Sequence, residues 1–180
     1  TSTPTGEAIV VILMTMAQLE NRIKSEKVRQ ARLQRSQEGL FNGKRPVLGY
    51  DLNPDPREAG HLEVNEAEAE IVRLAFKLYL ELGSDQEVSQ RLTDLGYRNK
   101  AWIQRETGDR LGGGPISASV VKTLLTSIIY IGMQNITELN ETTGKKDKIQ
   151  LEGCWEAIVD EDVFHIVQEA RRKSLHSRHN

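Results

Sequence analysis

The first forty residues carry the longest helical pattern in the chain. The segment Thr3–Gly6 offers a capping hydroxyl and a first-turn proline, and no Gly or Pro then follows until Gly39. Apolar residues recur at helical intervals from Ile9 to Ile23, and basic residues replace most of them beyond that point. The pattern predicts one helix over 5–38, about 50 Å long. Its first half needs an apolar partner, whereas its second half should project into solvent.

The centre of the chain predicts two short strands followed by two capped helices. Residues 49–52 and 61–64 have strand character on either side of a loop rich in proline and charge. A capping box predicts a helix over 65–82, and a second one predicts a shorter helix over 84–95. The expected inner positions of these helices are Ile71, Leu74, Ala75, Leu78, Tyr79, Val88, Leu92 and Leu95.

The last third predicts mixed short elements. Residues 97–115 favour a strand fragment and a glycine-rich loop, and 117–125 favour a short helix. The β-branched segment 128–139 predicts a strand that leads, after a turn, into 149–151. A final helix begins after Asp160.

These elements predict a mainly α fold with small β elements (α+β), in which a long N-terminal helix precedes a helical domain with short strands. We expect three parts: a long helix over 1–40, a basic linker with short strands over 41–64, and a helical domain over 65–180.

The three helices predicted over 65–82, 84–95 and 117–125 fit a helix-turn-helix with an enlarged connection. In that arrangement the third helix enters the major groove of DNA. Its exposed side chains would then reach the base edges; they are Ser117, Ser119, Lys122 and Thr123. The alternative is an ordinary three-helix core with one solvated face.

Composition excludes several classes of protein. Hydrophobic residues make up 38% of the 180 residues and charged residues 28%, as in a soluble globular chain. The longest apolar run, Ile9–Met14, is too short to span a membrane. One cysteine, Cys154, rules out an internal disulfide and a multi-cysteine zinc site. Gly112–Pro115 lacks the Lys-Ser/Thr of a phosphate loop. We therefore expect a cytoplasmic protein with no metal, no cofactor and no membrane partner.

Charge is strongly segregated, although the net charge is only −2. Residues 21–46 hold eight basic residues against two acidic ones, and residues 51–96 hold four against eleven. Residues 97–126 are again basic, with five against two. Two basic blocks around an acidic one indicate an elongated molecule that meets a polyanion. The alternative is that these charges only solvate the helices.

The basic segment Asn42–Pro46 has the chemistry of a minor-groove contact. Pro46 keeps the chain extended, and Gly43 lets the backbone approach a ligand closely. Arginine is attracted by the negative potential of a narrow minor groove, which suits Arg45. The alternative is a flexible linker.

Several segments in order resemble the large serine recombinases of the resolvase/invertase superfamily. Residues 1–6, 17–20 and 25–29 resemble the end of the catalytic domain in that family. Five later segments resemble motifs of the recombinase domain in that family. They are G-K-R-P-x-x-G-Y at 43–50, E-A-E-I-V-R-x-x-F at 68–76, L-x-x-x-G at 92–96, Y-x-G at 130–132 and I-V-D-x-x-x-F at 158–164.

The resemblance implies that 1–40 ends a catalytic domain and that 65–180 is the DNA-binding recombinase domain. It implies site-specific recombination of mobile DNA through a serine–DNA intermediate. The nucleophilic serine of the family would lie upstream of Thr1, so we expect no catalytic residue in this chain. The alternative is a stand-alone dimeric helix-turn-helix regulator.

The same resemblance, together with the charge segregation, suggests a role for each group of residues. The DNA-binding residues would be Arg22, Lys24, Lys27, Arg29, Arg32, Lys44, Arg45, Arg98, Lys100, Arg105, Ser119 and Lys122. Dimerisation, or packing on the catalytic domain, would use Ile9, Ile12, Leu13 and Met16. The expected partners are double-stranded DNA and a second copy of the chain, with a tetramer in the synaptic complex of the parent protein.

Overall fold

A computed structural model describes residues 3–43, 45–53, 55–104, 107–139 and 146–177. The helices are α1 (Pro4–Gln37), α2 (Glu66–Leu82), α3 (Asp85–Asp94), α4 (Ala118–Thr126) and α5 (Glu161–Ser177). The strands are β1 (Tyr50–Leu52), β2 (Leu62–Val64), β3 (Ala101–Ile103), β4 (Arg110–Gly112), β5 (Met133–Leu139) and β6 (Lys146–Glu152). The predicted class, mainly α with small β elements, is confirmed.

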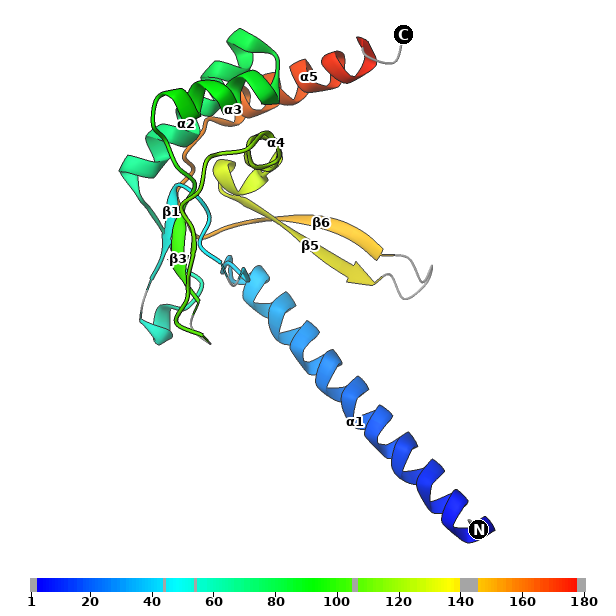
Figure 1. Cartoon of the computed structure of the whole chain (residues 1–180). Helices are drawn as coiled ribbons and strands as arrows, with labels where there is room; N and C mark the ends of the chain where they lie inside the picture. Colours follow the sequence, from blue (N-terminus) through cyan, green and yellow to red (C-terminus); the bar gives the residue numbers. More distant parts are fainter. Residues whose placement is uncertain (1–2, 44, 54, 105–106, 140–145, 178–180) are drawn as a thin grey trace.

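Helix α1 is a single rod that projects from the rest of the molecule (Figure 1). The Thr3 hydroxyl caps its N-terminus by accepting a hydrogen bond from the Gly6 amide at 3.3 Å. Gly39 follows the helix with φ 78°, a conformation that favours glycine. The helix predicted over 5–38 is therefore confirmed with its ends shifted by one residue.

Within the described residues, α1 is fixed to the body by its C-terminal end. Gln134 of β5 donates a 3.2 Å hydrogen bond to the Ser36 carbonyl, and Asn42 donates a 2.7 Å bond to the Ser36 hydroxyl. The Cys154 amide donates to the Gly39 carbonyl at 2.9 Å, so the two backbones pass in close contact. These bonds set the direction in which α1 leaves the body.

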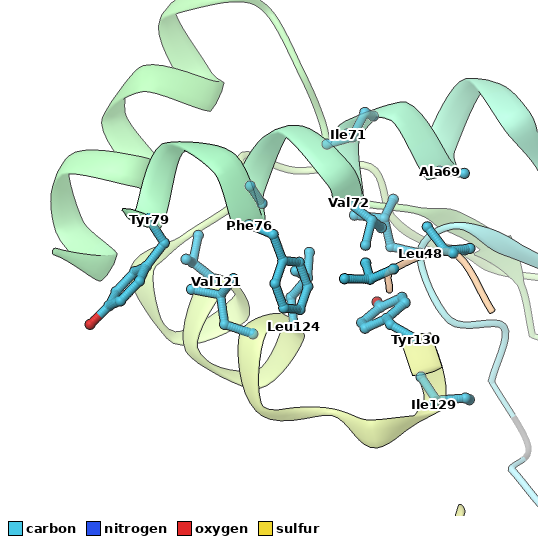
Figure 2. Packing of buried hydrophobic residues seen from close by; sticks show 14 of the residues in the cluster. Leu48, Ala69, Ile71, Val72, Phe76, Tyr79, Val121, Leu124, Ile129 and Tyr130 are labelled. Carbon is cyan, nitrogen blue, oxygen red and sulfur yellow. The ribbon is translucent and has the colours of Figure 1, made fainter. Parts of the chain in front are cut away.

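The core lies where α2 packs against α3, α4 and α5 (Figure 2). Phe76 of α2 is almost completely buried and contacts the rings of Tyr130 and Phe164, with centroids 6.4 and 6.1 Å apart. Tyr50 of β1 is also buried and stacks on Tyr130. This core holds the strand and the helices in one unit.

The six strands form three separate antiparallel pairs, β1–β2, β3–β4 and β5–β6. The first pair agrees with the predicted strands at 49–52 and 61–64. The second was predicted only in part, because the sequence favours one strand fragment and a glycine-rich loop where the structure has a hairpin with Trp102 opposite Leu111. In the third pair each strand has seven residues, so β5 is shorter than the predicted strand over 128–139 and β6 is longer than the predicted 149–151.

Three local predictions are wrong. Leu95 is 49% exposed rather than on an inner face, because α3 ends one residue before it. The segment Ile128–Ile131 forms a 3-10 turn, so the strand begins only at Met133. The capping box at Asn65 is half formed: its side chain accepts from the Glu68 amide at 3.3 Å, but the Glu68 carboxylate contacts other groups.

Candidate nucleic-acid interface

The second half of α1 carries a straight row of polar and basic side chains. Arg22, Ser25, Arg29 and Arg32 are spaced by three and four residues, which places them on one face of a helix. All four are exposed. Helical spacing puts Lys24 and Lys27 on the opposite side of the rod, where they are also exposed.

Internal carboxylates neutralise few of the α1 cations. Arg29 pairs with Glu26 at 3.0 Å and Lys24 approaches Glu20 at 4.0 Å, both at exposed helical positions. Such surface pairs are weak and exchange readily for other anions. In the described part of the chain, Arg22, Lys27 and Arg32 form no ion pair. The α1 cations are therefore available to an external polyanion.

The basic face of α1 leads into a groove of about 660 Å³ between this helix and β5. Arg29 and Arg32 line one wall, and Thr126 and Ser127 at the end of α4 line the opposite side. No carboxylate lies among the residues that line this groove, although the chain has 26 acidic residues. The groove is consequently electropositive and suited to an anion.

Arg35, which also belongs to the basic block, has a structural role instead. It is half-buried and donates hydrogen bonds to the Ala59 carbonyl at 2.6 Å and to Asn42 at 3.2 Å. These bonds tie the end of α1 to the loop between β1 and β2. Arg35 therefore does not extend the row of free cations.

The basic linker presents Arg45 to solvent. Its guanidinium carbon lies 5.6 Å from the centre of the Trp102 ring, a cation–π distance. Arg45 is exposed, and its described surroundings include no ion pair for it. Lys44, which sequence reasoning assigned to the same groove contact, lies outside the described residues.

Lys100 is corrected from a DNA contact to an internal ion pair. Its side chain is only 8% exposed, and its Nζ donates to Asp51 at 2.7 Å and to Glu68 at 2.6 Å. A buried ammonium held by two carboxylates cannot also reach a phosphate. Sequence spacing could not reveal this, because the partners lie 49 and 32 residues away.

This cluster also shifts the ionisation of Asp51. Partial burial opposes the charged carboxylate, but hydrogen bonds from Lys100 and Asn65 outweigh it and hold the pKa of Asp51 below its ordinary value. Asn65 donates to Asp51 at 2.8 Å. The cluster therefore joins β1, α2 and the start of the β3–β4 hairpin.

Helix α4 exposes polar and basic side chains. Ser119 and Lys122 are exposed, and the Ser119 hydroxyl lies 2.9 Å from that of Ser117. Arg98 is exposed, and its backbone pairs with that of Pro115. This pairing places Arg98 beside the segment that leads into α4. Arg105, also expected to contact DNA, lies outside the described residues.

The first half of α1 is apolar and open to solvent. Ile9, Ile12, Leu13 and Met16 are each more than half exposed. Contiguous apolar surface of this kind marks an interaction site. Within the described residues, every helix is too short or too polar to cross a lipid bilayer.

Sequence reasoning missed two parts of this interface. The sequence pattern places Trp102 within the strand fragment and glycine-rich loop predicted over 97–115, and it assigns no element to Thr126 and Ser127. Trp102 is a large aromatic residue in a segment with loop character, and that signal could have indicated a functional side chain. The polar groove residues carry no comparable signal, since only the fold brings them opposite α1.

A comparison with protein-family models decides the family. The model described as Recombinase matches residues 66–174, from the first residue of α2 into α5. This chain belongs to the recombinase family. None of the curated proteins matches this recombinase chain.

Two solved structures share the fold. One, titled "Crystal Structure of a LSR-DNA Complex", has 21% identity and a TM-score of 0.57, and the match covers 82% of this chain and 42% of that chain. The other, titled "Sequence Requirements of the Listeria innocua prophage attP site", has 22% identity and a TM-score of 0.55, with coverage of 80% and 50%. The recombinase chain thus spans half or less of the length of these relatives.

Proposed function

We propose that this chain is the DNA-binding portion of a site-specific serine recombinase, which acts in the integration, excision or transposition of mobile DNA. The parent protein would cut and rejoin DNA through a serine–DNA intermediate formed by an upstream domain. In this division, residues 1–40 end the catalytic domain, 41–64 form a basic linker, and 65–180 form the DNA-binding domain. Family membership and the fold shared with a protein solved as a DNA complex support this assignment.

The observation that carries the proposal is the cationic face of α1. Arg22, Arg29 and Arg32 follow one side of a projecting helix and continue into a groove without carboxylates. Cations arranged in a row can neutralise successive phosphates of a DNA strand and release their counterions. Arg45 would reach the minor groove, while Arg98, Ser119 and Lys122 would serve the major-groove side.

The two halves of α1 indicate two kinds of binding partner. Duplex DNA would lie along the basic half, and the apolar half would pack against a second copy of the chain or the upstream domain. We propose a homodimer on DNA and a tetramer in the synaptic complex of the parent protein.

A stand-alone dimeric helix-turn-helix regulator is the second candidate, because the exposed face of α4 and the apolar α1 also fit that class. The coding sequence upstream of Thr1 separates the two. A recombinase requires a nucleophilic serine there, whereas a regulator does not.

The test of DNA binding is fluorescence anisotropy with a labelled duplex at 100 mM salt. The triple variant Arg22→Gln/Arg29→Gln/Arg32→Gln should bind roughly a hundredfold more weakly, because three phosphate contacts are lost. The matched control is Lys77→Gln/Arg91→Gln/Lys173→Gln, which removes three exposed charges from α2, α3 and α5, at the other end of the molecule (Figure 1). Equal affinities of the two triple variants, or no binding by the wild-type chain at low salt, would refute the proposal.

A further inference from the structure

The contact between Arg45 and Trp102 joins two segments that are far apart in the sequence. Arg45 belongs to the linker after α1, and Trp102 belongs to β3. The guanidinium carbon lies over the ring at 5.6 Å. Stacking on a ring face leaves the N–H groups of a guanidinium at its edges free to donate hydrogen bonds. The contact therefore orders Arg45 without occupying its donors.

The Trp102 ring is itself fixed by its own hairpin. A Cβ atom at Gly112 would lie 2.1 Å from the Lys100 carbonyl oxygen and 2.7 Å from the Trp102 ring. Only glycine leaves room for the ring at this place, and the φ of +80° at Gly112 also favours glycine. The indole is therefore packed directly against the backbone of β4.

The hairpin is in turn fixed to the body. Lys100, two residues before Trp102, is held by Asp51 of β1 and Glu68 of α2 at 2.7 and 2.6 Å. The strand that carries the ring therefore begins next to a buried lysine, whose ion pairs join it to β1 and α2. The linker that carries Arg45 is anchored upstream, where Asn42 donates to the Arg32 carbonyl at 2.9 Å.

We propose that Trp102 is a positioning residue that presents the Arg45 guanidinium to duplex DNA. This inference rests on the function proposed above. A free arginine loses much rotamer freedom when it binds, and that loss weakens binding. The Trp102 ring holds the side chain in one arrangement before DNA arrives, so less freedom is lost on association.

The experiment is a double-mutant cycle on duplex binding by the full chain, with Trp102→Leu, Arg45→Ala and the double variant. Leucine keeps apolar volume over Gly112 but has no aromatic face. Trp102→Leu should weaken binding by about two- to fivefold in the wild-type background. It should have no effect in the Arg45→Ala background, since the guanidinium is already absent. Trp102→Tyr restores an aromatic face and should bind as the wild type does.

Ile103→Ala is the matched control, because Ile103 is adjacent on the same hairpin and 68% exposed. It should leave affinity unchanged. The inference is overturned if Trp102→Leu binds DNA as tightly as the wild type does. It is also overturned if Trp102→Leu lowers affinity by the same factor in the Arg45→Ala background, or if Ile103→Ala lowers affinity as much as Trp102→Leu does. Failure of the wild-type chain to bind DNA would overturn the proposed function instead. Binding by the wild type with an uncoupled cycle would overturn only the role of Trp102.

Discussion

At the scale of single residues, partners decide what a basic side chain does. Lys100 is buried between two carboxylates, Arg35 is bound to a backbone carbonyl, and Arg32 is exposed with no described ion partner. All three belong to basic stretches of the sequence. Burial and internal partners give Lys100 and Arg35 structural roles, whereas Arg32 is available to an external anion.

Loss of the Lys100 ammonium should destabilise the fold. Lys100→Ala leaves Glu68, a partly buried carboxylate, without its cation, and we expect a loss of roughly 1–3 kcal/mol in the free energy of unfolding. Lys77→Ala, at an exposed position of α2, should change it by less than about 0.5 kcal/mol. Urea unfolding followed by circular dichroism measures both. Equal stability of the two variants would contradict the structural role of Lys100.

The same cluster predicts a dependence of stability on pH. The pKa of Asp51 is lower in the folded chain than its ordinary value of 3.8. The ionised Asp51 carboxylate therefore contributes its full share to the stability of the fold when the pH is above that ordinary value. This stabilisation is lost as the pH falls through the lower folded pKa. The stability difference between the wild type and Asp51→Asn should be larger at pH 5 than at pH 2.5. A difference that does not shrink on acidification would argue against this ion pair.

At the scale of elements, caps and glycines fix where helices and hairpins begin and end. The Thr3 cap and Gly39 bound α1, and Asn65 begins α2. In the β3–β4 hairpin, Gly112 allows the Trp102 ring to pack on the backbone. The identities of single capping and glycine residues thus determine the shape of the proposed binding surface.

Gly112→Ala should disrupt the β3–β4 hairpin. The new Cβ would meet a backbone carbonyl oxygen at 2.1 Å, and the positive φ adds strain of roughly 1–2 kcal/mol. Gly114→Ala is the control, because a Cβ there meets nothing within 4 Å and no positive φ is required. Thermal unfolding should show a lower Tm for Gly112→Ala alone. A Gly112→Ala chain as stable as Gly114→Ala would refute this account of the hairpin.

Sequence reasoning predicts elements with local signals and misses those with distant causes. Capping residues and helical periodicity are local, so α1, α2 and α3 are placed within about a residue. The β3–β4 hairpin has strands of three residues, and its base is held by an ion pair from Lys100 to β1 and α2. Likewise, the α1 cations are visible as a charge block, whereas the groove opposite them exists only in the folded chain.

At the scale of the whole molecule, the two halves of α1 present surfaces of different chemistry. The apolar half stands in solvent, and the basic half joins the groove beside β5 (Figure 1). An exposed apolar rod is unfavourable in isolation, because its surface gains from burial. These two surfaces are the basis for the proposed protein contact at one end of α1 and the proposed DNA contact at the other.

Self-association should depend on the apolar half of α1. Sedimentation of the chain should show dimers that dissociate on Ile9→Ser/Leu13→Ser/Met16→Ser. The variant removes apolar surface but no charge. Val28→Ser is the control, since it changes an exposed apolar residue in the basic half. A wild-type chain that stays monomeric at high concentration would contradict the proposed dimer contact.

The most direct test of the central claim is the slope of DNA affinity against salt concentration. Each phosphate neutralised by a cation contributes a slope of about −0.9 in a plot of log K against log salt. The wild-type slope should be steep, and that of Arg22→Gln/Arg29→Gln/Arg32→Gln should be shallower by about 2 to 3. The charge-matched variant of Lys77, Arg91 and Lys173 should keep the wild-type slope. If the α1 variant keeps it too, the basic face of α1 does not contact the DNA backbone.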